Sequence, residues 1–160
     1  MDGRTGAMSP VTGVLLGVGN SLNGDDGVGS WVAQRFRAPG WLAIDCGTAP
    51  ENFTAVVRRA APSTLVVVDA AALREPPGTM RRIPPTRIED TGIGTHMLPL
   101  SHVLEFLRPS VGQIELVGIE PACLDVGAGL SSPVLDAGRQ LLALLDAGRW
   151  HEIPLLSPMG

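Results

Sequence analysis

The chain has 160 residues, of which 44% are hydrophobic and 18% charged, and this composition is typical of one globular domain rather than of a disordered chain. The formal net charge of -4 gives no basic footprint for a nucleic acid, and all 12 basic residues are arginine because the sequence contains no lysine. A P-loop lysine, Schiff-base chemistry and a lysine general base are therefore excluded.

The cysteines and the apolar stretches indicate a reduced protein outside the membrane. Cys46 and Cys123 form no CxxC pair, so neither a zinc knuckle nor a redox pair is indicated. We expect Cys46 to be a small buried residue rather than a catalytic thiol. No apolar stretch reaches the roughly 20 residues that span a bilayer, and residues 1–10 lack a signal-peptide pattern. We therefore expect a cytoplasmic protein that neither inserts into a membrane nor binds nucleic acid.

Short apolar runs alternate with segments of helical periodicity along most of the chain. In chain order we expect a strand at 14–18, a helix at 28–36, strands at 41–44 and 64–68 separated by a helix at 53–60, an edge strand at 79–83, a helix at 100–107, a strand at 113–119 and a helix at 134–145. This alternation predicts βαβ units. The expected fold is therefore a three-layer α/β domain with a twisted, mostly parallel sheet of about five strands flanked by helices. We expect the domain at residues 13–149, a flexible leader at 1–12 and a tail at 150–160.

The loop after the first strand, residues 17–27, is rich in glycine and carries Asp25 and Asp26. A dinucleotide-binding GxGxxG fingerprint would need its third glycine at position 22, where the chain has Leu22, and two carboxylates would repel a pyrophosphate. Asp25 is well placed to cap the next helix, because its carboxylate can accept the free N–H groups of the first turn. The helix dipole explains one aspartate here better than it explains two.

Asp69 follows the apolar strand 64–68 and so lies at the carboxyl edge of the sheet, where open α/β folds bind ligands. By itself it is equally compatible with a strand-ending residue that caps the next turn. If the first three strands have the order 2-1-3, Asp26 and Asp69 overhang the same crevice. Two close carboxylates repel unless they share a proton or bind a cation. The pair therefore suggests a cation site.

His96 lies in a glycine-containing loop that is placed to fold over the crevice, although a surface position is the simpler alternative. Two carboxylates and one imidazole would leave coordination positions open, as a working metal site requires. A triad of Ser21 with His96 and Asp69 can also be drawn, but the GxSxG nucleophile elbow is missing. We expect His102 and His151 to be structural or surface residues.

Five segments, in order along residues 14–148, resemble the hydrogenase maturation endopeptidase family, and most closely its branch for hydrogen-evolving or group-3/4-type hydrogenases. They are Gly17–Gly27, Asp45–Asn52, Val66–Ala70, Thr95–Leu100 and Val117–Pro121. The first of these segments is the most specific.

The resemblance implies a metal-binding triad made by an acidic residue in the first loop, an aspartate at the end of the third strand and a histidine in a later loop. In this sequence the three positions are Asp26, Asp69 and His96. We expect these residues to be both the catalytic and the metal-binding residues. The chain departs from the family at Glu120, where glutamine is frequent, and this affects the expected substrate contact there rather than the metal site.

The resemblance also implies a metal-dependent endopeptidase, of a family often classed as aspartic-type. Its members remove a short C-terminal extension from the large-subunit precursor of a nickel-iron hydrogenase after nickel insertion. The expected partner is that precursor, and the expected metal is nickel supplied by it, with another divalent ion able to bind in vitro. The metal either polarises the scissile carbonyl or activates water, or it only positions the precursor while an aspartate serves as base.

Three alternatives to this function remain open. The chain is also compatible with a nickel-binding escort that holds the precursor without cleaving it. A peptidyl or nucleoside hydrolase of similar architecture would instead act on small substrates without any precursor. A nucleotide-binding α/β protein would bind NAD or ATP.

Overall fold

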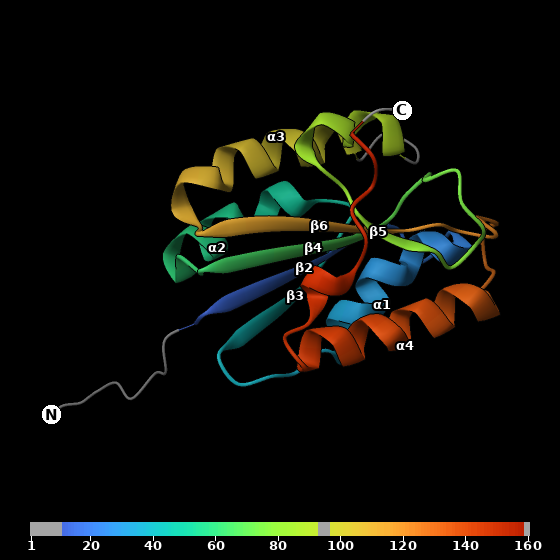
Figure 1. Cartoon of the computed structure of the whole chain (residues 1–160), viewed down its shortest axis with the longest axis horizontal. Coiled ribbons are helices and arrows are strands. Elements are labelled where there is room, and N and C mark those ends of the chain that lie inside the picture. Colours follow the sequence, from blue (N-terminus) through green and yellow to red (C-terminus); the bar gives the residue numbers. More distant parts are fainter. Residues whose placement is uncertain (1–10, 93–96, 159–160) are drawn as a thin grey trace, which may run out of the picture.

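A five-stranded sheet forms the centre of the molecule, with the strand order β3-β2-β4-β6-β5 (Figure 1). The computed structural model describes residues 11–92 and 97–158 of the chain. Four strands are parallel: β2 (Gly13–Val18), β3 (Trp41–Gly47), β4 (Thr64–Ala70) and β6 (Gln113–Ile119). The short β5 (Met80–Arg82) pairs antiparallel with β6, as the expected edge strand. The first three strands have the 2-1-3 order on which the meeting of Asp26 and Asp69 depends, and β4 lies directly beside β2.

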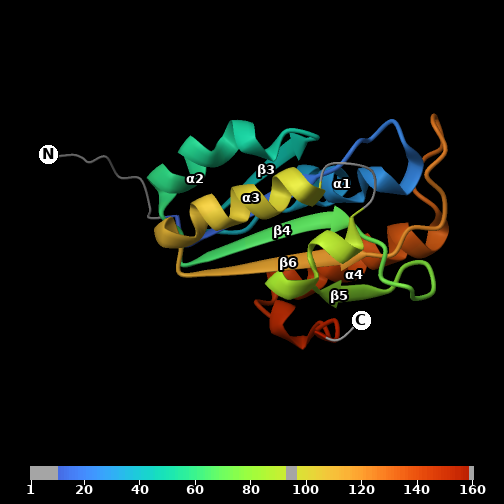
Figure 2. The same ribbon diagram turned by 90° about the horizontal axis from the view of Figure 1, so that it is seen from above.

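Helices cover both faces of the sheet (Figure 2). On one face α1 (Val28–Arg35) and α4 (Ser132–Asp146) share an apolar cluster with the sheet. On the other face α2 (Thr54–Ala60) and α3 (Met97–Leu107) do the same. Short 3-10 helices connect these elements: η1 (Gly24–Gly27), η2 (Pro50–Phe53), η3 (Pro85–Arg87), η4 (Glu89–Thr91), η5 (Arg108–Ser110) and η6 (Trp150–Glu152). The predicted three-layer α/β fold is confirmed.

The central strands are apolar on both sides because both faces of the sheet are covered. In β2, Val14 and Leu16 are completely buried in the cluster with α2 and α3, and Leu15 is completely buried in the cluster with α1 and α4. Residues of β4 alternate in the same way. Strand β3 is three residues longer than its apolar run predicts, because its pairing with β2 continues as far as Gly47.

Helix α1 is held against the sheet by a contact between backbones. A Cβ atom on Gly17 would lie 2.1 Å from the carbonyl oxygen of Gly29, and a Cβ atom on Gly29 would lie 2.3 Å from the carbonyl oxygen of Val68. Both distances are far below van der Waals contact, so only glycine allows this approach. The contact fixes the N-terminal end of α1, and with it the turn η1 that carries Asp25 and Asp26.

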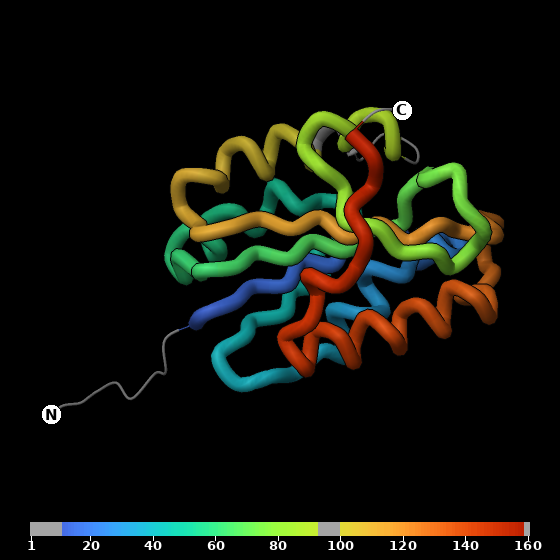
Figure 3. Tube along the Cα trace, viewed as in Figure 1, coloured from blue at the N-terminus to red at the C-terminus, as the bar shows by residue number. Residues whose placement is uncertain are grey.

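The C-terminal segment crosses the outer strand β5 (Figure 3). Its described part, up to residue 158, buries Ile153 and Leu156. The backbone N–H of Arg82 donates to the carbonyl of Pro154 at 2.9 Å, and the N–H of Leu156 donates to the carbonyl of Arg82 at 2.8 Å. The part of the expected tail that is described therefore covers an edge strand, which would otherwise present unpaired backbone groups. None of the helices in the described ranges is both long and apolar enough to cross a bilayer.

Candidate active site

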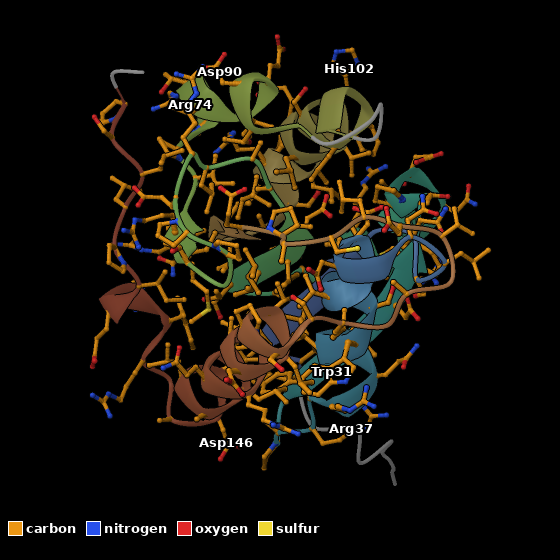
Figure 4. The ribbon with its side chains drawn as sticks, turned by 90° about the vertical axis from the view of Figure 1, so that its right-hand side faces the viewer. Trp31, Arg37, Arg74, Asp90, His102 and Asp146 are labelled. Atoms are coloured by element: carbon orange, nitrogen blue, oxygen red, sulfur yellow. The ribbon has the colours of Figure 1, made fainter. Side chains whose placement is uncertain are left out.

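The loops that follow β2, β4 and β6 meet at the carboxyl edge of the sheet, which faces the viewer in Figure 4. Backbone hydrogen bonds join them in pairs. The N–H of Asp25 donates to the carbonyl of Cys123 at 2.8 Å, and the N–H of Ala71 donates to the carbonyl of Ile119 at 3.0 Å. This is the edge at which open α/β sheets bind their ligands.

Asp26 and Asp69 converge on Gly19 at this edge. Asp26 is 5% exposed, and its Oδ2 accepts a hydrogen bond of 3.0 Å from the N–H of Asn20. Asp69 is completely buried near the end of β4. A Cβ atom on Gly19, whose φ is +140°, would lie 2.0 Å from the carbonyl oxygen of Asp26 and 3.4 Å from Oδ1 of Asp69. The main chain of Asp26 and the side chain of Asp69 thus both lie next to Gly19, and the Asp26 carboxylate lies at the N–H of the next residue, Asn20.

His96, the third predicted site residue, lies outside the described residues. Across 11–92 and 97–158, no group of three or more His, Cys, Asp or Glu side chains is arranged to hold a metal ion. Before the gap, the carbonyl of Thr91 accepts a hydrogen bond of 3.0 Å from the N–H of Ala72. The chain therefore leaves the described structure close to the loop that follows Asp69.

Asp25 is not the helix cap that its position predicts. Helix α1 follows Gly27 and has no side-chain cap. The buried Asp25 carboxylate instead accepts four hydrogen bonds of 2.7–3.0 Å from a distant loop: from the N–H groups of Ala122, Cys123 and Ser131 and from the Ser131 hydroxyl. Burial by itself would raise the pKa of Asp25, but these hydrogen bonds outweigh it and lower the pKa below its usual value. The first of the two adjacent aspartates is therefore a structural residue.

Glu120 fixes the loop that follows Asp69. Its Oε1 accepts hydrogen bonds from the N–H groups of Leu73, at 2.7 Å, and Glu75, at 3.1 Å. Between these two residues, Arg74 has a positive φ of 61°, which is unusual for a residue with a side chain. The family resemblance implied a substrate contact at Glu120. In the structure, its carboxylate accepts two hydrogen bonds from the chain's own backbone. No local sequence signal links Glu120 to a loop more than 40 residues earlier.

The other candidate residues, a cysteine and two histidines, are either unreactive or exposed on the surface. Cys46 is 5% exposed, and burial, reinforced by the charges of Asp45 and Glu51, raises its pKa to about 12. A thiol with this pKa is not a ready nucleophile. His102 is exposed and points away from the sheet (Figure 4), and His151 is also exposed, as expected for surface residues.

Known proteins are similar to this chain in both sequence and fold. The family described as HycI, hydrogenase maturation protease, matches residues 28–146. The hydrogenase 3 maturation protease of Escherichia coli strain K12 is 36% identical over 131 residues, covering 79% of this chain and 84% of that protein. The solution structure of the endopeptidase HycI from E. coli gives a TM-score of 0.81 at 30% identity, covering 93% of this chain and 99% of that one.

A crystal structure of the [NiFe] hydrogenase maturation protease HycI from Thermococcus kodakarensis gives a TM-score of 0.76 at 26% identity, covering 87% of this chain and 92% of that one. The α/β fold and the sequence are therefore those of an endopeptidase. The chain belongs to the hydrogenase maturation protease family, and the resemblance seen in its sequence is confirmed.

Proposed function

We propose that this endopeptidase removes the C-terminal extension of a [NiFe]-hydrogenase large-subunit precursor once nickel has been inserted, and that Asp26, Asp69 and His96 form its site. The observation that supports this most strongly is that two buried aspartates lie beside the Gly19–Asn20 segment, at the ligand-binding edge of a fold shared with hydrogenase maturation proteases: Oδ1 of Asp69 lies near Gly19, and the Asp26 carboxylate accepts a hydrogen bond from the N–H of Asn20. We propose the cytoplasm as the compartment, in keeping with Cys46 and Cys123, which are both free thiols.

The donor set fits a divalent ion. Carboxylate oxygens and one imidazole suit Ni(II), and without soft ligands they need not retain it once the substrate's own ligands have left. Gly19 lacks the Cβ atom that would clash with the main-chain carbonyl of Asp26, so the chain can pass close to both aspartates. Asp26, Asp69 and His96 would therefore hold nickel that arrives with the precursor. Such an ion would polarise the scissile carbonyl or lower the pKa of a bound water.

The chain's own residues orient the reacting groups and keep water away from them. The N–H of Asn20 holds Oδ2 of Asp26 and so fixes the direction of that carboxylate. Burial of Asp69 keeps its charge in a low-dielectric setting, where its interaction with a cation is stronger than in water. An aspartate at this position is also suited to take the proton of the attacking water as the peptide bond breaks.

The decisive experiment compares nickel-loaded with nickel-free precursor. We expect mass spectrometry to show loss of one C-terminal peptide from the nickel-loaded precursor only. If the precursor binds but keeps its extension, the chain is an escort and not a protease. Turnover of small peptides or nucleosides without any precursor would favour the other hydrolases, and a thermal shift with NAD or ATP would favour a nucleotide-binding protein.

A Cys46→Ala variant tests whether a thiol takes part. We expect the cleavage rate to stay within about twofold of the wild-type rate, because the buried, protonated thiol of Cys46 is a poor nucleophile. The rate is measured as precursor converted per minute, at a temperature where circular dichroism shows both proteins folded. A loss of about 100-fold or more would assign a covalent role to Cys46.

A further inference from the structure

Large apolar side chains are exposed on two adjoining loops beside the candidate active site. Among the described residues, five large apolar side chains are exposed, and three of them lie here: Leu22 at 70%, Leu124 at 39% and Val126 at 83%. We call these three residues the apolar loop patch. Scattered single apolar residues are normal on a surface, but a cluster of this kind marks an interaction site.

The two loops hold each other in place. Asn23 and Val126 form an isolated antiparallel β-bridge, and the N–H of Gly127 donates to the carbonyl of Leu22 at 2.9 Å. The four hydrogen bonds to the Asp25 carboxylate fix the second loop at both ends, near residues 122 and 131. The patch is therefore presented on a fixed backbone, so little ordering entropy is lost when a partner binds.

The apolar loop patch is continuous with the catalytic edge. The side-chain Oδ1 of Asn20 accepts a hydrogen bond of 2.9 Å from the N–H of Leu22, while the backbone N–H of Asn20 donates to Asp26. One residue thus touches both the proposed catalytic acid and the first residue of the patch. Figures 1 and 2 show the two loops side by side beyond the carboxyl ends of the strands. The patch therefore borders the position of Asp26, within reach of a protein whose peptide bond is held there.

We propose that the apolar loop patch docks an apolar surface segment of the hydrogenase large-subunit precursor, an inference that rests on the proposed function. A second copy of the chain is the less suitable occupant. Stable dimers bury about 800 Å² per partner, and three side chains supply only a small part of that area. As one part of a larger enzyme–substrate contact, three apolar side chains on a fixed backbone contribute through burial of apolar surface that is exposed in the free protein.

The test is a Leu22→Ser/Val126→Ser double variant. Both side chains are largely exposed, and the backbone bonds of the two loops are kept, so the melting temperature should not change. We expect the double variant to raise the KM for the nickel-loaded precursor, and its Kd by biolayer interferometry, about tenfold or more, while kcat stays within about twofold. Leu155→Ser is the matched control, because Leu155 is a leucine, 52% exposed, in the region of another isolated β-bridge.

The outcomes of this test distinguish docking of the precursor from self-association and from the absence of any binding role. Unchanged KM and Kd in the double variant overturn the docking proposal, as does an equal rise in the Leu155→Ser control. A wild-type dimer that dissociates in the double variant, seen by analytical ultracentrifugation, assigns the patch to self-association instead. If the wild type binds the precursor through the patch and never cleaves it, docking stands and the proposed protease function fails.

Discussion

Asp69→Asn is expected to lower the rate of precursor cleavage by about 10²–10⁴-fold, the range for loss of a positioned acid or base. Asparagine has nearly the same shape as aspartate but carries no charge to attract a cation or to take a proton. The Asp69 side chain is completely buried beside Gly19, and the next residue, Asn20, bonds the Asp26 carboxylate, so we expect removal of one of two like charges to relieve repulsion. We therefore expect the melting temperature to stay the same or to rise.

The measurement is kcat and KM by mass spectrometry, together with the melting temperature by circular dichroism. Asp26→Asn should give a loss of the same order. Asp45→Asn is the matched control: Asp45 lies near the carboxyl end of β3, at the same edge of the sheet, but it is exposed and its carboxylate accepts hydrogen bonds from Ser30 and Gln34. Asp69→Asn protein that cleaves at the wild-type rate would remove Asp69 from the site.

The same logic applies to the imidazole. His96→Ala should abolish processing, while His102→Ala, at an exposed position on α3, should leave it unchanged. Full cleavage by the His96→Ala protein would refute the three-residue site, even if both aspartates prove essential.

Asp25→Ala is expected to lower the free energy of unfolding by about 3 kcal/mol, because three backbone N–H groups and one hydroxyl lose a charged acceptor. The pKa of Asp25 is lower in the folded protein than its ordinary value of 3.8. Its stabilising contribution is therefore complete above the unfolded pKa and is lost as the pH falls through the folded pKa. Wild type and variant should differ fully at neutral pH and converge in strong acid.

Urea unfolding at a series of pH values measures this difference. Asp136→Ala is the surface control, because Asp136 is exposed and its ion pair with Arg139 is 3.7 Å long. That control should change stability by less than about 0.5 kcal/mol. A difference between wild type and Asp25→Ala that stays constant down to strong acid would mean that the Asp25 carboxylate is not the source of the stability.

The sequence predicts the strands well where their residues are continuously apolar. Residues 113–119 form a strand with the expected ends, and the βαβ alternation predicts the parallel sheet. The alternation alone does not determine the 2-1-3 order of the first three strands, because neighbouring strands in the sheet are chosen by packing between distant segments. The extension of β3 to Gly47 is set by its partner strand, which local pattern does not contain. The few apolar residues at 153–156 show no helical or strand periodicity, so the sequence predicts a tail beyond residue 149, although the described part of that segment packs on β5 and buries Ile153 and Leu156.

Some features of the candidate site can likewise be predicted from local sequence, and others cannot. Asp26 and Asp69 are predictable because each sits at a recognisable strand end or helix start, and the sheet brings these positions together. The role of Asp25 is not predictable, because its hydrogen-bond partners lie 97–106 residues further along the chain. Adjacent aspartates look alike in a sequence, and only the distant loop distinguishes the structural one from the one that faces Gly19.

The contact between Gly17 and Gly29 has a consequence for engineering, because it positions the proposed catalytic residue independently of the residues proposed to bind the substrate. Helix α1 meets the sheet through main-chain atoms, so the position of Asp26 owes little to the side chains of the outer loops. Under the docking proposal, exchange of residues 22 and 124–126 is expected to change which precursor the enzyme binds, provided that Asp25, whose carboxylate bonds the second loop, is retained. The choice of precursor could then be changed by substitutions in the two loops, without any change to the residues that position Asp26.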